Sequence, residues 1–298
     1  MKQFIIKISI VLGFAITAWL LIVYFNIEKF NDYNYLKLTH ENNSLIIGTS
    51  RARFAIDPSA FKKYPDMHNF AFTAAASPYG EVYFNAIKRK IKGGENNLFI
   101  LEVDPYGLSE EKDNEKSVKT DKKNCVGRQI FIDVDPNFEY IFKNETPVYA
   151  PLMNNEKINM HVYENGFSVV DNSFSTEKTE AMKKAKLIQY QKESDQNKPS
   201  EYRIEYLEKT IDYLQQYGEV YLVNVPIGDK LYNIQKKYWP QHEDKMKEIA
   251  QKHGTYYIPL QKYYPQLKTF DEVHVLSEDA LPISTFLAHQ IDSLKKIQ

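Results

Sequence analysis

The sequence predicts an α/β fold, in which a doubly wound parallel sheet of five strands follows one N-terminal transmembrane helix. Three observations support it: an uncharged apolar segment near the start, short apolar runs that then alternate with amphipathic stretches, and one interruption of that alternation at about residues 106–200. A chain of 298 residues can form one large domain. We therefore interpret residues 44–298 as a single α/β domain with an insertion.

Residues 1–26 are interpreted as a transmembrane anchor. Residues 8–25 carry no charge, and at 1.5 Å per residue a helix of that length just crosses a hydrocarbon layer of ~30 Å. Lys2 and Lys7 precede it, which places the N-terminus in the cytoplasm and the remainder outside. A cleaved signal peptide starts similarly but ends in small residues, whereas this segment ends in LLIVYF. The polar residues 27–43 are expected to be a tether.

Five short apolar runs are expected to form the strands of the sheet. They are residues 44–48, 68–72, 97–103, 219–225 and 255–260, and the expected helices are residues 79–92, 201–217, 241–253 and 279–295. Glycine follows three of these helical stretches, where helices commonly end. Because sites in such folds form at the carboxyl ends of the strands, residues that directly follow a strand are candidates for function.

The insertion interrupts this pattern for nearly a hundred residues. It begins with the charge run SEEKDNEKSVKTDKKN, which is typical of a solvated loop. Residues 127–144 and 159–174 are expected to form short strands or hairpins. An insertion of this length is often a lid over a site.

Composition argues against several functions. The 38 Lys and Arg nearly cancel the 39 Asp and Glu, so no broad basic field is available for nucleic acid. Cys125 is the only cysteine, which excludes an intramolecular disulfide and a cysteine-based zinc site, and its polar surroundings do not favour a reactive thiol. No histidine pair stands at metal-ligand spacing with a carboxylate, and GGENN lacks the Lys-Ser/Thr of a phosphate loop. We expect neither a metal nor another cofactor.

Ser50 is the first candidate for chemistry. The run SLIIG leads into the turn formed by Thr49, Ser50 and Arg51, so a buried strand delivers a serine to a sharp turn. A serine hydroxyl is a weak nucleophile at neutral pH; it needs an imidazole to take its proton and a carboxylate to orient that imidazole. The alternative interpretation is that Ser50 only caps the next helix or turn.

His274 is the base that the sequence suggests for Ser50. The other six histidines lie in the tether, at a strand start, in the insertion or in helical stretches: His40, His68, His161, His242, His253 and His289. His274 instead lies in a loop between the last strand and the final helix, three residues after Asp271. One turn can bring this carboxylate to the imidazole, and both Ser50 and the loop fall at the carboxyl edge of the sheet. An Asp-x-x-His pair also occurs by chance, so the triad is a hypothesis.

Four segments carry a family resemblance: IIGTSRARFAIDP, HNFAFTAAASPYG, FILEVDPYGLSE and FDEVHVLSEDA. They resemble the successive blocks of SGNH/GDSL-type hydrolases, and more narrowly membrane-anchored bacterial members that act on acyl groups of cell-envelope polymers. The resemblance covers about residues 44–108 and 219–297. It implies a flavodoxin-like, SGNH-type sheet with Ser50, Asp271 and His274 as the catalytic triad.

The sequence departs from this family at the oxyanion hole. The family usually supplies a glycine in the second block and an asparagine in the third, where this chain has TAAASP and VDPYGL. The backbone N–H groups of Arg51 and of Ala74 or Ala75 would have to hold the oxyanion instead. Loss of one such donor typically lowers the rate about 100- to 1000-fold.

Arg51 itself has two interpretations. It can pair with an acidic residue such as Asp104 at the neighbouring strand end, since a buried arginine generally needs a partner. It can instead bind a carboxylate or phosphate of the substrate.

These features predict an extracytoplasmic serine esterase or O-acyltransferase that works through an acyl-enzyme. The resemblance and the anchor together imply an acylated glycan or similar envelope polymer as the substrate, with a membrane acyltransferase as a candidate partner. One alternative is a catalytically inactive SGNH-fold protein that binds or assembles components of an envelope-polymer acylation or export system. Another is an α/β-hydrolase, suggested by GTSRA, but that motif requires glycine where Ala52 stands and a mid-sheet strand.

Overall fold

The computed structural model describes residues 1–27, 34–39, 43–91, 93–112, 121, 126, 129–132, 134–143, 160–170 and 174–296. Its centre is a parallel sheet of five strands: β1 (Leu45–Ile47), β2 (His68–Asn69), β3 (Asn97–Glu102), β8 (Gly218–Asn224) and β9 (Tyr256–Pro259). The strand order is β2-β1-β3-β8-β9. This order places the third strand beside the first, as in flavodoxin-like sheets, and so confirms the predicted fold class.

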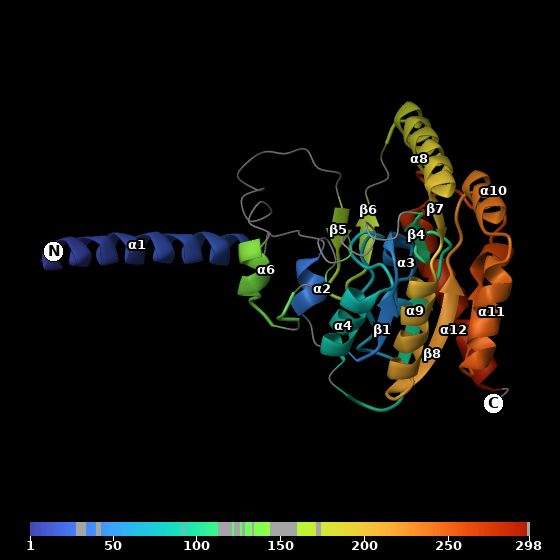
Figure 1. The fold of residues 1–298 in the computed structure, drawn as a ribbon, viewed down its shortest axis with the longest axis horizontal. Coiled ribbons are helices and arrows are strands. Elements are labelled where there is room, and N and C mark those ends of the chain that lie inside the picture. The colour runs from blue at the N-terminus through green and yellow to red at the C-terminus, as the bar shows by residue number, and fades with distance from the viewer. Residues whose placement is uncertain are drawn as a thin grey trace.

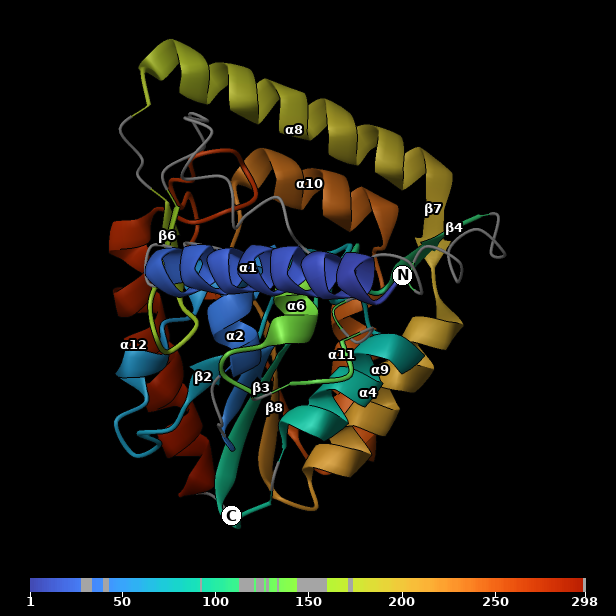
Figure 2. The same cartoon turned by 90° about the vertical axis from the view of Figure 1, so that its left-hand side faces the viewer.

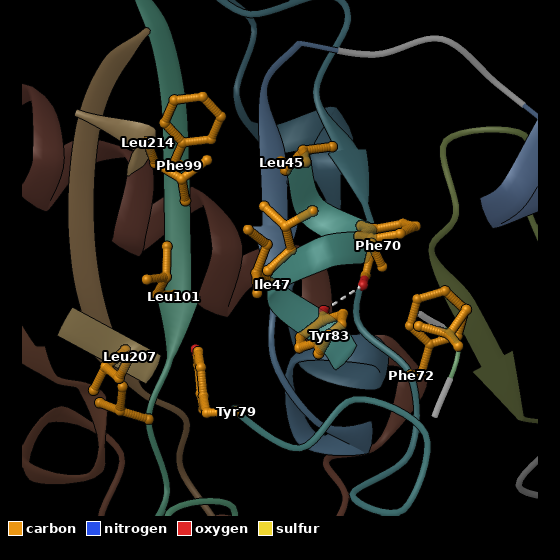
Figure 3. Packing of buried hydrophobic residues seen from close by; sticks show 14 of the residues in the cluster. Leu45, Ile47, Phe70, Phe72, Tyr79, Tyr83, Phe99, Leu101, Leu207 and Leu214 are labelled. Atoms are coloured by element: carbon orange, nitrogen blue, oxygen red, sulfur yellow. Dashed lines mark hydrogen bonds between the residues drawn. The ribbon is translucent and has the colours of Figure 1, made fainter. Parts of the chain in front are cut away.

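Helices cover both faces of the sheet, because alternate residues of each buried strand point to opposite sides. One face packs against α4 (Glu81–Lys90), α9 (Glu201–Leu214) and α11 (His242–Lys252); the other packs against α3 (Ser50–Ala55) and α12 (Ser277–Lys295). On the first face, Leu45 and Ile47 of β1 lie beside Phe99 and Leu101 of β3, and the Tyr83 hydroxyl donates to the carbonyl oxygen of Phe70 at 2.8 Å (Figure 3).

The four helices expected in the sheet domain are all present, as α4, α9, α11 and α12. Two of them show the usual residues at their ends. Ser200 caps α9 by accepting from the Arg203 N–H at 3.3 Å, and α11 is followed by Gly254 with a φ of +62°. Two helices of the sheet domain were missed. One is α3, in the segment expected to be a turn, and the other is α10 (Asp229–Tyr238), which follows β8 and buries only Leu231 and Gln235.

The insertion forms its own small elements outside the central sheet. A hairpin of β5 (Met160–Val162) and β6 (Ser168–Val170) lies within the segment expected to form one. The structure corrects the expectation for residues 127–144, where α6 (Phe138–Lys143) is a helix. The long helix α8 (Thr176–Gln196) was also missed, since none of its residues is buried enough to create a pattern. A two-stranded pair, β4 (Ser109–Glu111) and β7 (Asn197–Pro199), closes the insertion.

Helix α1 (Lys2–Ile27) projects away from the folded body (Figure 1). Within the described residues it is the one helix long and apolar enough to cross a membrane, over Lys2–Ile22, and no part of that window is buried. The expected tether is only partly observed, because residues 28–33 and 40–42 lie outside the described ranges. Residues 35–39 are not a tether: they form helix α2 (Tyr35–Thr39), whose Tyr35 and Leu38 are buried in the core.

Gly48 links β1 to the turn that carries Ser50, and we expect the Gly48→Ala variant to lose about 2 kcal/mol or more of unfolding free energy. Its φ is +152°, and an added Cβ would lie 2.6 Å from the Cβ of Glu102. Urea unfolding of the full chain in detergent measures the loss. The control is Gly93→Ala, since Gly93 has a φ of +128° but no atom within 4 Å of an added Cβ. Equal losses in the two variants would rule out the steric explanation.

Candidate active site

Ser50 is the first residue of α3, directly beyond the carboxyl end of β1. Thr49 is the N-cap of this helix, and its hydroxyl oxygen accepts from the Arg51 N–H at 3.4 Å. Ser50 therefore does not cap the helix, because Thr49 does so. Its side chain is left to interact with other parts of the chain.

The loop between β9 and α12 brings a histidine to Ser50. His274 Nε2 lies 2.8 Å from Ser50 Oγ, and His274 Nδ1 lies 2.8 Å from Asp271 Oδ2. The imidazole is held between two aromatic rings, with ring centroids 5.1 Å from Phe54 and 5.4 Å from Phe270. The structure thus brings together the three side chains that the sequence singled out.

The Asp271 carboxylate is held by more than the imidazole. Its Oδ1 accepts from the main-chain N–H groups of Val273 at 3.0 Å and His274 at 2.9 Å. Burial by itself would raise the pKa of Asp271, but these hydrogen bonds and the His274 ring lower it below its ordinary value. An ionised carboxylate at this position accepts the Nδ1 proton of the imidazole, which leaves Nε2 free to accept the proton of the serine hydroxyl.

The Asp-His loop is anchored on both sides. Its base is a β-bridge between Thr269 and Val275, and the Gly228 N–H donates to the Glu272 carbonyl oxygen at 2.9 Å. Beyond it, Ser284 of α12 contacts the end of α3: its hydroxyl oxygen accepts from the Asp57 N–H at 2.8 Å and lies 3.2 Å from the Ala55 carbonyl oxygen, while its proton has a closer acceptor in the Ala280 carbonyl at 2.7 Å. These contacts connect the histidine and the serine, although β9 lies at the edge of the sheet and β3 and β8 separate it from β1.

The backbone N–H groups expected to hold the oxyanion differ in their surroundings. Ala74 and Ala75 lie exposed in a turn, and Ser77 holds that turn against the first strand by donating its hydroxyl to the Gly48 carbonyl oxygen at 2.7 Å. This bond holds the turn beside Gly48, two residues before Ser50. The Arg51 N–H, by contrast, already donates to Thr49 across the 3.4 Å contact.

The Arg51 side chain is buried beside the site and pairs with Asp104, as the first interpretation held. The Arg51 Nη1 to Asp104 Oδ1 distance is 3.6 Å, and the two side chains are only 2% and 3% exposed. Gln235, with its amide oxygen turned toward the guanidinium, accepts from both Nη atoms at 2.7 and 2.6 Å. The Tyr190 ring of α8 covers the guanidinium at 5.8 Å. These partners leave Arg51 as part of the support of the site and not as an exposed anion-binding group.

Glu102 is a second buried acid in this cluster, and sequence analysis missed it. Its Oε2 accepts from the Thr49 N–H at 2.9 Å and from the Thr49 hydroxyl at 3.0 Å, while its Oε1 has no hydrogen-bond partner among the described residues. Burial raises the pKa of Glu102 to about 8, and the negative charge of Asp104 adds to the increase, against the opposing effects of Arg51 and the Thr49 hydrogen bonds. A protonated Glu102 leaves Arg51 and Asp104 as a neutral pair. The available signal was a carboxyl residue within the otherwise apolar run NLFILEV.

We expect Glu102→Gln to flatten the pH dependence of stability. Because the pKa of Glu102 is higher in the folded than in the unfolded chain, folding binds a proton, and wild-type stability falls as pH rises from about 5 through about 8. The glutamine does not titrate and keeps an oxygen that can accept from Thr49. The measurement is the urea midpoint at about pH 5 and about pH 8, with the exposed Glu95→Gln as control. If the urea midpoint of Glu102→Gln changed between the two pH values as much as that of the wild type, Glu102 would not be protonated in the folded chain.

The insertion contributes to the site through α8, which lies across α10 (Figure 2). Leu187 and Tyr190 of α8 pack against a small cluster that contains Ile227, Leu231 of α10 and Val273 of the Asp-His loop. Since Tyr190 also contacts Arg51, α8 touches both sides of the triad. No sequence pattern indicated this, because the contact depends on two side chains of a mostly exposed helix.

The other candidates are not part of the hydrogen-bonded chain from Ser50 to Asp271, although the buried His242 lies close enough to Asp104 and Arg51 to feel their charges. His68, His161, His242, His253 and His289 fall on β2, β5, α11, the end of α11 and α12, and His40 and Cys125 lie outside the described residues. Among the residues that the structure describes, no group of three or more His, Cys, Asp and Glu is arranged to hold a metal ion.

The chain was compared with known proteins. No protein-family model matches it, and no curated protein sequence matches it. Among solved structures, the chain is similar to Est24, a carbohydrate acetylesterase from Sinorhizobium meliloti, with 7% sequence identity and a TM-score of 0.42. That alignment covers 85% of this chain and 99% of Est24. A likeness at this level does not identify a reaction or a substrate for this chain. The functional interpretation therefore rests on the geometry of Ser50, His274 and Asp271.

Proposed function

We propose that this chain is an SGNH-type serine hydrolase, an esterase or O-acyltransferase that works through an acyl-enzyme on Ser50. The observation that supports it is the continuous hydrogen-bonded chain from Ser50 Oγ through His274 to Asp271, with both contacts at 2.8 Å. Nucleophile, base and orienting carboxylate at these distances are what acyl transfer by a serine requires.

The proposed reaction has two steps. Ser50 Oγ attacks the ester carbonyl while His274 Nε2 takes the hydroxyl proton, and the same nitrogen then protonates the leaving alcohol as the acyl-oxygen bond breaks. In the second step, His274 takes a proton from water or from an acceptor hydroxyl, whose oxygen attacks the acyl carbonyl; the bond between the acyl group and Ser50 Oγ then breaks, and His274 returns the proton to Oγ. Asp271 remains ionised throughout and stabilises the charged imidazole.

The proposed substrate is an acylated glycan or a similar envelope polymer. Two features support it: the resemblance of the four sequence blocks to membrane-anchored envelope hydrolases, and the apolar helix α1, long enough to hold the domain at a membrane. With α1 as an uncleaved anchor and Lys2 and Lys7 on the cytoplasmic side, the domain is extracytoplasmic. The proposed partner in that location is a membrane acyltransferase.

A fluorophosphonate probe, which reacts only with an activated serine, tests this proposal. We expect labelling of the wild-type chain, no labelling of Ser50→Ala, and unchanged labelling of the control Ser59→Ala, which removes an exposed hydroxyl. Labelling that persists in Ser50→Ala would place the reactive group elsewhere. Comparing acyl release to water with acyl transfer to a sugar hydroxyl then separates esterase from acyltransferase.

The second candidate function is a catalytically inactive protein that binds or assembles components of an envelope-polymer acylation or export system. The observation that favours it is the composition of the oxyanion region. Asp104 stands in the block where the family usually has its asparagine donor, and Asp104 is held by Arg51. A folded wild-type chain that takes up no probe would support this second function over the first.

A further inference from the structure

An exposed apolar surface lies where the body of the protein meets α1. It consists of five side chains from residues 130–142, which we call the juxtamembrane patch: Ile130 (68% exposed), Phe131 (54%), Val134 (42%), Phe138 (44%) and Phe142 (59%). Single exposed apolar residues are common on soluble proteins, but five within thirteen residues, three of them phenylalanine, form a contiguous segment that marks an interaction surface.

The patch is continuous with the membrane-spanning helix. The Phe142 ring stacks on Trp19 of α1, with centroids 4.8 Å apart and an interplanar angle of 15°. Figure 1 shows α6 next to the end of α1 that meets the body, and in Figure 2 α6 lies directly below α1. Trp19 lies inside the uncharged apolar run of residues 8–25, six residues or about 9 Å short of its end. A ring stacked on Trp19 must therefore sit at the same depth, in the interfacial layer of the bilayer.

The segment is also held rigidly by polar contacts. Glu139 accepts from the N–H groups of both Ile130 and Phe131 at 2.7 Å. Asn137 donates its side-chain amide to the Phe131 carbonyl oxygen at 2.8 Å, and its own N–H donates to the buried Tyr35 hydroxyl at 3.1 Å. These bonds satisfy backbone groups that an interfacial segment cannot leave unpaired. They also fix the direction in which the apolar side chains point.

The two sides of α6 differ in the way expected of a helix that lies on a membrane. Tyr140 and Ile141 are buried in the core, whereas Phe138 and Phe142, four residues apart, share an exposed face. The Glu139–Lys143 ion pair supplies the polar groups of the helix. Interfacial segments combine these features: aromatic residues toward the acyl boundary and charged groups toward water.

We propose that the juxtamembrane patch inserts into the interfacial layer of the membrane that α1 crosses. The inference rests on α1 remaining attached as an anchor, and it is independent of the chemistry at Ser50. Two attachments, a spanning helix and a patch, hold the domain in one orientation, whereas a helix followed by a flexible tether would let it rotate. The domain then has a fixed orientation relative to the membrane, and this orientation determines which of its surfaces is accessible to a substrate.

Depth-dependent quenching in lipid vesicles tests the proposal on the full chain. Cys125 is replaced by Ser, one cysteine is introduced as Phe138→Cys or as Ile188→Cys, and each is labelled with an environment-sensitive fluorophore. Ile188 is the matched control: it is an apolar side chain, 61% exposed, on α8, which lies farther from α1 than α6 does (Figure 1). Vesicles are phosphatidylcholine, with or without brominated acyl chains.

We expect the label in Phe138→Cys to lose most of its emission in brominated vesicles and to be shielded from aqueous iodide. The label in Ile188→Cys should show the opposite behaviour. A Phe138→Cys label that is quenched by iodide as strongly as the Ile188→Cys label, and not by bromine, would overturn the proposal and leave the patch for a protein partner. Phe131→Cys provides a second position, and the replaced side chains, Phe138 and Phe131, are both exposed and leave the Phe142–Trp19 stack in place.

Discussion

Replacing His274 with Gln is expected to lower the turnover of an activated acetyl ester about 10⁴-fold or more. Glutamine can hydrogen-bond to Ser50 but cannot take its proton, so the hydroxyl remains a weak nucleophile. Because the triad acts as a unit, the double variant Ser50→Ala/His274→Gln should be little slower than either single variant. Steady-state kinetics on the full chain in detergent measure both results.

The chain offers a close control for this experiment. His253 Nδ1 lies 2.7 Å from Asp212 Oδ1, which is the same imidazole–carboxylate pair as at the site but on the surface of α9 and α11. We expect His253→Gln to leave turnover unchanged. A His274→Gln variant that keeps turnover within about tenfold of wild type would show that His274 is not the base.

Removing the Arg51 guanidinium is expected to have the largest effect on stability. Arg51→Met should lower the free energy of unfolding by about 3–5 kcal/mol, because it leaves the Asp104 carboxylate buried without a cation. Burial alone would lower the pKa of Arg51, but Asp104 and its other neighbours hold it above its ordinary value, so the guanidinium is charged in the wild type. Urea unfolding followed by circular dichroism measures the loss.

The control for Arg51→Met is an ion pair of similar chemistry on the surface. Lys63 Nζ lies 2.9 Å from Asp292 Oδ1, with the two side chains 69% and 37% exposed. Lys63→Met should change stability by about 1 kcal/mol or less, because water solvates both charges. Equal effects of the two replacements would show that the burial of Arg51 does not matter to stability.

Most of the sheet domain could be predicted from the sequence, because its strands are buried on both faces. A run such as LII in β1 has no polar position to place in water, and the amphipathic α9 and α11 show which face is covered. Two of the missed helices, α8 and α6, lack such a pattern. Helix α8 has no buried residue, and α6 is six residues long within a segment rich in β-branched and aromatic side chains, which favours a strand.

Some residues of the candidate site could be identified from the sequence and others could not. Ser50, Asp271 and His274 were identifiable because each lies just beyond an expected strand or within a short local motif. Glu102 and Gln235 were not, because their importance arises only from neighbours: the pKa of Glu102 depends on burial beside Asp104, and Gln235 faces Arg51 from a helix 184 positions away in the chain. The oxyanion donors remain a prediction, and the exposed turn at Ala74 and Ala75 is their proposed place.

By itself, then, the sequence determined the α/β class, the apolar N-terminal segment and three side chains suited to acyl transfer, since these follow from local periodicity and short spacings. Only the tertiary structure decided that the imidazole reaches Ser50 from beyond the edge strand, that Arg51 is enclosed by Asp104, Gln235 and Tyr190, and that an apolar patch adjoins α1. The physical reason is that burial and charge pairing are properties of groups in space, and chain order sets neither.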